Sequence, residues 1–166
     1  MSAIDQHLEN LKTGALHHFS DWPNKDMPQA AAGVYSIWNQ HNEFVYVGMA
    51  GRGKSVADIN AAQLSGKKTG LFHRLNSHAS GVRSGDQFCV YVQDLLILKR
   101  LTTEQIDQIV TRQLTLDRLV RDYVRQNFSY RFTVTTDGTE ALEIERIIIN
   151  GAFGEHPILN PPSHLR

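Results

Sequence analysis

Two short apolar runs separated by a polar turn constrain the fold more than any other feature of this 166-residue chain. The runs cover residues 33–38 and 44–48, are rich in valine and aromatic residues, and flank the polar residues 39–42. This pattern predicts an antiparallel hairpin. Each strand carries one tyrosine, Tyr35 or Tyr46, directly after a valine, Val34 or Val45. A regular register therefore places both phenols on one face of the hairpin, opposite the valines.

The length and composition are those of one globular domain with its own core. Apolar residues make up 41% and charged residues 20% of the chain, which are ordinary values. The longest apolar candidate for a membrane span, around residues 95–98, ends at Lys99, and the N-terminus lacks the pattern of a secretion signal. Cys89 is the only cysteine, so an internal disulfide is impossible. These features favour the cytoplasm.

Hydrophobic periodicity predicts helices around a small sheet. We expect helices over residues 2–12, 71–79 and 103–126, and a last one after Asp137, which with Glu140 has the spacing of a capping box. Alternating residues predict strands over residues 88–98, including Cys89, and over residues 129–135. Residues 48–70 are expected to be a long connection of the functional or mobile kind. The expected fold class is α/β, a single domain with a small central antiparallel sheet flanked by helices.

Basic residues gather just after the hairpin. The formal net charge is zero, which argues against nonspecific coating of nucleic acid. Residues 45–85, however, carry six basic side chains and one acidic one, whereas residues 1–44 carry two basic and five acidic ones. Arg52, Lys54, Lys67 and Lys68 are therefore candidate contacts for a phosphate backbone. A solvated loop is the alternative interpretation.

The last helix offers two carboxylates, and helical geometry chooses between them. At 100° per residue, its apolar residues form one stripe with Glu145 in the middle, whereas Glu143 lies on the opposite side. A carboxylate in an apolar stripe is costly without a partner. The partner is either a cation such as Arg74 in a buried ion pair, or a divalent metal ion. Mg²⁺ is commonly held by one or two carboxylates with water and phosphate, so Glu145 is the candidate metal ligand.

Arg74 and His78 are four residues apart on the helix that follows the basic segment. A guanidinium there can bind a phosphate with two hydrogen bonds and stabilise developing charge, or it can simply pair with a surface acid. His78 can bind phosphate or relay a proton. No cluster of cysteine and histidine supports zinc.

The segment from Gly48 to Ser55 fits the spacing of a phosphate-binding P-loop, with Lys54 as its lysine. A P-loop would make the protein a nucleotide-binding enzyme. No aspartate-ending second strand follows at a suitable place, so this interpretation is the weaker one.

Taken in order, these elements resemble the GIY-YIG nuclease family. Gly33-Val34-Tyr35 and Tyr46-Val47-Gly48 stand where the family name reads, and the arginine helix and the spacing from Ala141 to Glu145 follow. Asn160 before Pro161 matches the Asn-Pro element that ends the family core. The resemblance extends from Gly33 to Asn160.

The resemblance implies a role for each site residue. Tyr35 activates or orients the attacking water, Tyr46 and His78 assist, and Arg74 stabilises the transition state. Glu145 holds Mg²⁺ or Mn²⁺, and the amide of Asn160 ties the last loop to the catalytic strands. Gly48 is expected to let the backbone approach the substrate at a strand end. The alternatives are an ordinary strand residue for each tyrosine and an ordinary turn residue for Asn160.

The resemblance also implies the organisation and the activity. Residues 33–166 form the nuclease domain, residues 1–32 an N-terminal helix and loop extension, and residues 88–127 an insertion. The expected activity is metal-dependent hydrolysis of phosphodiester bonds in DNA, with RNA as the other possible substrate. A catalytically inactive nucleic-acid-binding or protein-interaction module on the same fold is the alternative. We expect no membrane association. The sequence leaves the oligomeric state open, and a homodimer through the helix at residues 103–126 is one arrangement to test.

Overall fold

A four-stranded antiparallel sheet forms the centre of the protein, whose computed structural model describes residues 2–162. Its spatial order is β1 (His17–His18), β6 (Phe128–Val134), β3 (Gly33–Asn39) and β4 (Phe44–Ala50). The predicted hairpin is formed by β3 and β4, and β4 is at one edge of the sheet. A separate parallel pair joins β2 (Ala30–Ala31) to β5 (Thr69–Gly70).

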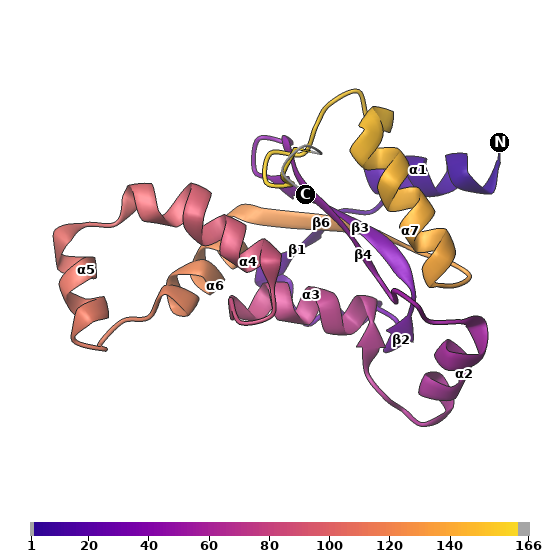
Figure 1. Ribbon diagram of the computed structural model, residues 1–166, viewed down its shortest axis with the longest axis horizontal. Helices are drawn as coiled ribbons and strands as arrows, with labels where there is room; N and C mark the ends of the chain where they lie inside the picture. The colour runs from indigo at the N-terminus through magenta and orange to yellow at the C-terminus, as the bar shows by residue number, and fades with distance from the viewer. Residues whose placement is uncertain (1, 163–166) are drawn as a thin grey trace.

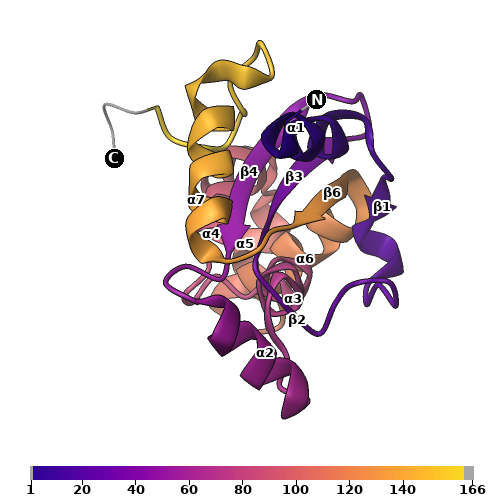
Figure 2. The same ribbon diagram turned by 90° about the vertical axis from the view of Figure 1, so that its right-hand side faces the viewer.

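Helices cover both faces of the sheet (Figures 1 and 2). On one face lie α1 (Ala3–Thr13) and α7 (Gly138–Ile147), which share a core cluster with Val34 and Val47. On the other lie α3 (Leu71–Ser80), α4 (Gln87–Val92) and α6 (Leu116–Asn127). Short helical turns complete these layers at Phe19–Asp21, Gln93–Ile97, Leu98–Arg100 and Ile148–Ala152. The predicted α/β class, with a small antiparallel sheet between helices, is confirmed.

The hairpin register puts both tyrosines on the face covered by α3. Tyr35 pairs with Gly48, Ile37 pairs with Tyr46, and the register then shifts by one residue. The shift leaves Val45 as an extra residue, and its side chain packs in the same cluster as Tyr35. The expectation that both valines face away from the phenols is therefore wrong for Val45, because a bulge interrupts the alternation.

Residues 2–32 are part of the common core and not a separate extension. Ser2 caps α1 with a full capping box, and Leu11 at the other end of the helix is completely buried. The hydroxyl of Ser36 in β3 donates a hydrogen bond to the carbonyl of Leu11 (2.6 Å). Strand β1 then pairs with β6 in the four-stranded sheet, and β2 pairs with β5 in the two-stranded sheet. The expected boundary at residue 32 thus divides a single packed unit.

The segment predicted as a strand at residues 88–98 is helical. Asp86 is the N-cap of α4, and its side chain accepts hydrogen bonds from the backbone of Phe88 and Cys89. Phe88, Cys89 and Val92 are all completely buried, at a spacing that suits a helix. The strand prediction is wrong because valine and aromatic content outweighed the capping signal in the sequence.

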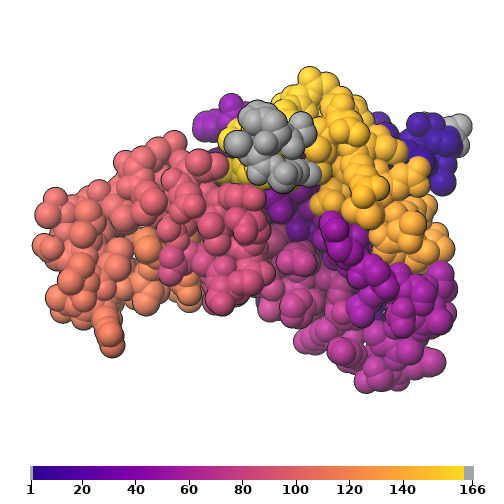
Figure 3. All heavy atoms as spheres, in the orientation of Figure 1, coloured from indigo at the N-terminus to yellow at the C-terminus, as the bar shows by residue number. Residues whose placement is uncertain are grey.

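The helix predicted over residues 103–126 is broken in two. Helix α5 (Thr103–Val110) ends before Arg112, whose φ is +62°, and α6 begins after the N-cap Thr115. The apolar stripe is not continuous either, since Val110 is 76% exposed whereas Val124 is completely buried. The arm, which we define as residues 93–115, projects from the rest of the molecule (Figure 3).

The connection after β4 contains its own helix, α2 (Val56–Leu64), and leads through β5 to α3. Its first residues are held against the start of α7, because the amide of Gly138 donates to the carbonyl of Lys54 (3.0 Å). A Cβ on Gly138 would lie 1.9 Å from the oxygen of Gly51, so only glycine permits this approach. In the part of the chain that the structure describes, no helix has the length and apolarity needed to cross a membrane.

Candidate active site

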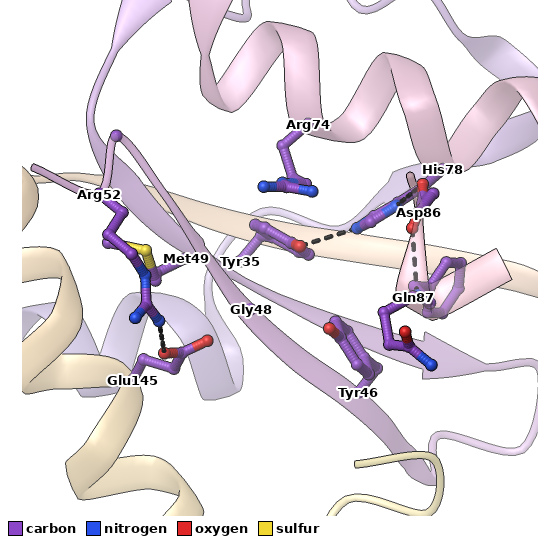
Figure 4. A pocket seen from close by; sticks show the side chains of 12 residues that line it. Tyr35, Tyr46, Gly48, Met49, Arg52, Arg74, His78, Asp86, Gln87 and Glu145 are labelled. Carbon is purple, nitrogen blue, oxygen red and sulfur yellow. Dashed lines mark hydrogen bonds and ion pairs between the residues drawn. The ribbon is translucent and has the colours of Figure 1, made fainter. Parts of the chain in front are cut away.

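One polar cavity of about 220 Å³ opens beside β4, and it is lined by all five side chains predicted to be catalytic (Figure 4). They come from three separate parts of the sequence: the β3–β4 hairpin, α3 and α7. These side chains are Tyr35, Tyr46, Arg74, His78 and Glu145. The sequence therefore identified a set of residues that the fold does bring together.

A short chain of hydrogen bonds forms the closed side of the cavity. The hydroxyl of Tyr35 lies 2.7 Å from Nε2 of His78, and Nδ1 of the same ring lies 2.6 Å from Oδ2 of Asp86. All three side chains are at most 2% exposed. The Phe88 ring packs on the imidazole with a centroid distance of 4.5 Å. Because the three side chains are buried, these hydrogen bonds are stronger than they would be in water.

Burial keeps both tyrosines in their neutral form. The pKa of Tyr35 is raised well above 10, first by burial and then by the neighbouring Tyr46. The pKa of Tyr46 is also raised, by burial and by the negative charge of Glu145. A free phenolate is therefore not populated near neutral pH. If Tyr35 takes a proton from water, it must pass its own proton to a neighbour at the same time, and His78 is within hydrogen-bond reach.

Asp86 is the site residue that sequence reasoning missed. It lies at the start of α4, a segment read as a strand, where a carboxylate has no evident role. The available signal was the helix-start pattern, an aspartate followed by buried residues at helical spacing such as Phe88 and Val92. Gln87, the first residue of α4, also lines the cavity. The beginning of α4 thus forms one wall of the candidate site.

Gly48 is required by Tyr35 and not by a strand end. It lies within β4, directly opposite Tyr35 in the register. A Cβ at this position would lie 2.3 Å from the hydroxyl oxygen of Tyr35, closer than atoms can approach. The missing side chain leaves the space that the phenol fills. The expected role at a strand end is therefore corrected: Gly48 lies within the strand and allows the Tyr35 phenol to pack against it.

Glu145 lies on the open side of the cavity. It sits on the flank of the buried stripe of α7, next to the fully buried Ile144, and its side chain is 16% exposed. An oxygen of its carboxylate lies 4.0 Å from the guanidinium of Arg52, which is 72% exposed (Figure 4). The loop that carries Arg52 is the one held against the start of α7 by Gly138. Arg52, which belongs to the basic segment after the hairpin, therefore forms an ion pair with Glu145.

The other predicted nucleic-acid contacts divide into near and far groups. Arg52 and Arg74 line the cavity, and Arg74 extends over it beside Tyr35 (Figure 4). Lys67 and Lys68 are exposed on the connection between α2 and β5, and Lys68 lies over the ring of Phe72 (4.9 Å). Lys54 is half-buried in the turn before α2. Only the two arginines are therefore in position to touch a group inside the cavity.

Two groups of side chains merit a test as metal ligands. The carboxylates lining the cavity are Asp86 and Glu145, and Asp86 is already bonded to His78. Glu145 is accessible and faces polar side chains, which fits Mg²⁺ held by one carboxylate with water and phosphate as further ligands.

His78, Asp86 and Cys89 form a second close group, with ligand atoms within 4.8 Å of one another. Both ring nitrogens of His78 already have partners. Burial and the charge of Asp86 raise the pKa of the Cys89 thiol, whereas a metal ion requires the thiolate. This group is better suited to hydrogen bonding than to holding an ion.

The P-loop interpretation is not supported by the fold. Gly48 belongs to β4, which continues to Ala50, so the loop between β4 and α2 has only five residues. The side chain of Ser55 caps α2 and donates a hydrogen bond to the carboxylate of Asp58. The backbone amide of Lys54 donates to the carbonyl of Gly51 within a turn. The preceding strand also belongs to an antiparallel sheet.

Asn160 ties the end of the chain to β4, as expected. Its side-chain amide donates to the carbonyl of Val47 and its oxygen accepts from the amide of Val47, both at 2.9 Å. The backbone of Leu159 donates to Val45 (2.8 Å). The segment therefore occupies main-chain hydrogen-bonding groups on the outer edge of β4 around Tyr46.

Comparisons of the chain with protein-family models, with curated proteins and with solved structures gave no match.

Proposed function

We propose that the protein is a metal-dependent endonuclease that hydrolyses phosphodiester bonds in DNA through a GIY-YIG-type site, and that it acts in the cytoplasm. The observation that carries this proposal is the convergence of two phenols, a guanidinium, an imidazole and a carboxylate on one cavity. Each of these groups has a distinct task in phosphodiester hydrolysis, and a structural role would not require all five at one place.

Proton removal from water falls to Tyr35 and His78. Water transfers a proton to the oxygen of Tyr35, while the phenol transfers its own proton to Nε2 of His78. The resulting hydroxide oxygen bonds to phosphorus, and the bond between phosphorus and the leaving alkoxide breaks. The alkoxide takes a proton from solvent, and the proton on His78 returns to solvent by the same path. Tyr46, whose ring lies 6.4 Å from that of Tyr35, holds the water or a phosphate oxygen.

Arg74 is suited to the phosphate itself. Its guanidinium is exposed at the cavity, where it can form two hydrogen bonds to the scissile group and stabilise the charge of the transition state. Arg52, Lys54, Lys67 and Lys68 would contact flanking phosphates of the strand. These contacts carry no sequence information, so the proposal makes no statement about a recognition sequence.

Glu145 would hold the metal ion, Mg²⁺ or Mn²⁺. A bound ion neutralises phosphate charge and assists the departure of the leaving group. The nearby Arg52 guanidinium, 4.0 Å from the carboxylate, supports the proposal because a cationic group is already drawn to this carboxylate.

A cleavage assay on supercoiled plasmid and on branched DNA, with and without Mg²⁺ or Mn²⁺, tests the proposal. Wild type is compared with Glu145→Ala and Arg74→Ala. Glu143→Ala and His73→Ala are matched controls, because they are exposed residues of the same two helices. We expect metal-dependent cleavage that falls by at least about 10²-fold in the two site variants and is unchanged in the controls.

Binding of DNA without cleavage of any substrate would contradict the enzyme and favour the inactive module. Cleavage that is equal in Glu145→Ala and wild type would contradict the assignment of this cavity as the site. RNA of matched sequence in the same assay distinguishes the two substrate classes.

The homodimer stays a prediction. The helix on which it was expected is divided, and only α5 presents apolar residues to solvent, with Ile106 47% and Val110 76% exposed. Sedimentation of wild type and Val110→Lys measures it: a dimer that dissociates in the variant supports contact through α5, and a wild-type monomer contradicts it.

A further inference from the structure

The two oxygens of Asp86 perform two different tasks. Oδ1 accepts hydrogen bonds from the amides of Phe88 (3.1 Å) and Cys89 (3.4 Å), and so caps α4. Oδ2 lies 2.6 Å from Nδ1 of His78. The carboxylate is only 2% exposed, and every one of these partners is itself buried. The carboxylate is therefore held with one oxygen toward α4 and the other toward His78.

This geometry determines which nitrogen of His78 carries the proton. An ionised carboxylate can only accept hydrogen bonds, so Nδ1 must be the donor toward Asp86. Burial alone would favour the protonated acid, but the hydrogen bonds from His78 and from the backbone of Cys89 oppose it, and the pKa of Asp86 is lowered. In the neutral ring, Nε2 then has a lone pair and accepts the hydrogen bond from the hydroxyl of Tyr35.

We infer that Asp86 is a positioning residue of the hydrolytic site, which holds His78 as the Nδ1–H tautomer so that Nε2 receives the proton of Tyr35. This inference rests on the proposed function for its catalytic consequence. When Nε2 takes the proton, the ring becomes an imidazolium, and the carboxylate 2.6 Å away stabilises its charge. Asp86 keeps its own negative charge throughout, and no proton moves from His78 to it.

Directing the phenol proton toward His78 also leaves the lone pairs of Tyr35 to the cavity. A phenol oxygen that donates to Nε2 can accept a hydrogen bond from water on its other side. In the opposite tautomer, Nε2–H would donate to the phenol oxygen, and the hydroxyl hydrogen would point elsewhere. Tyr35 could then no longer pass its proton to the ring. The Asp86 carboxylate thus selects the only neutral tautomer in which the transfer can occur.

Asp86→Asn is a sharp test because it preserves the cap. Asparagine is as good an N-cap as aspartate, and its oxygen must face the amides of Phe88 and Cys89 to cap α4. Its NH₂ group then faces Nδ1 of His78 and donates to it, which moves the ring proton to Nε2. Asp86→Ser keeps a capping oxygen but removes the partner of His78. Asp94→Asn, an exposed carboxylate nearby in the chain, is the matched control.

The first readout is the tautomer, which needs no activity. Long-range ¹H–¹⁵N spectra of the imidazole rings, with the His78 signals assigned from their loss in His78→Gln, report which nitrogen is protonated. We expect Nδ1–H in wild type and in Asp94→Asn, and Nε2–H in Asp86→Asn. An Nε2–H ring in wild type, or an unchanged tautomer in Asp86→Asn, would overturn the inference.

The second readout is cleavage of plasmid DNA with Mg²⁺ under saturating substrate. We expect kcat to fall by about 10³-fold in Asp86→Asn with KM nearly unchanged, by less in Asp86→Ser, and not at all in Asp94→Asn. Circular dichroism and thermal unfolding verify that α4 is kept. An Asp86→Asn protein with the inverted tautomer and full activity would refute the positioning role.

The two proposals fail in different ways. If wild type does not cut DNA although its His78 is the Nδ1–H tautomer, the nuclease proposal fails and the structural part of the inference stands. If wild type cuts DNA and Asp86→Asn cuts it equally well, the nuclease proposal stands and the inference fails.

Discussion

The two sides of the cavity are built on opposite principles. On the closed side, Tyr35, His78 and Asp86 are at most 2% exposed and are connected by hydrogen bonds of 2.6–2.7 Å. On the open side, Glu145 is partly exposed and meets Arg52, which is 72% exposed, at 4.0 Å. One side is fixed by packing, and the other is held by a surface loop.

This difference corresponds to two chemical tasks. Moving a proton requires donors and acceptors at fixed distances without competing water, whereas binding an ion and a charged polymer requires access from solvent. Changes on the closed side should therefore cost stability as well as activity. Changes on the open side should alter binding with little effect on folding.

The largest stability effect is expected for His78→Ala on the closed side. Removing the imidazole leaves the Asp86 carboxylate buried without this partner, and breaking a buried pair costs about 3–5 kcal/mol. Urea or thermal unfolding measures the loss. His73→Ala, on the exposed side of the same helix, is the control and should change stability by less than about 0.5 kcal/mol. A loss of stability below about 1 kcal/mol in His78→Ala would mean that the His78–Asp86 pair is not buried as the structure describes.

A smaller loss is expected for Gly48→Ala. The added methyl group would lie 2.3 Å from the hydroxyl of Tyr35 and force it to move, which costs about 1–3 kcal/mol. The same displacement should slow cleavage about 10²-fold. The added methyl group would lie closest to the hydroxyl oxygen of Tyr35, with the ring carbon Cζ next at 2.6 Å, so Tyr35→Phe should restore only part of the stability in the double variant. Additive losses in the double-mutant cycle would place the conflict elsewhere.

The smallest effect on folding is expected for Arg52→Ala on the open side. Its ion pair is exposed, so the free energy of unfolding should change by less than about 0.5 kcal/mol. If Arg52 contacts a phosphate, the slope of log affinity for DNA against log salt should decrease by about 1. Titrations at several salt concentrations measure the slope. A large stability loss with an unchanged slope would erase the contrast between the two sides.

Much of the fold could be predicted where local pattern and tertiary role agree. The hairpin, the helix ended by Gly81 and the last helix all have strong periodicity and the proper end signals, and all are present. The same patterns located Tyr35 and Glu145, since the helical angle separated Glu145 from Glu143.

The errors arose where local preference conflicted with capping or packing. Valine and aromatic residues after Asp86 suggest a strand, but the carboxylate caps the first turn of a helix and the core accepts its face. Residues 103–126 were predicted as one long helix because their apolar spacing continues, whereas Arg112 takes a positive φ that interrupts it. Asp86 was missed because the segment after it was predicted as a strand, and because its second partner, His78, becomes a neighbour only in the folded structure.

The segment that carries Asn160 has a consequence for how molecules meet. The outer strand of an open sheet attracts foreign strands, and here the main-chain groups of Phe44, Val45 and Val47 are occupied by Ile158, Leu159 and Asn160. A second copy therefore cannot extend the sheet along this part of the strand. Three residues, Ile158, Leu159 and Asn160, thus protect it from edge-to-edge association.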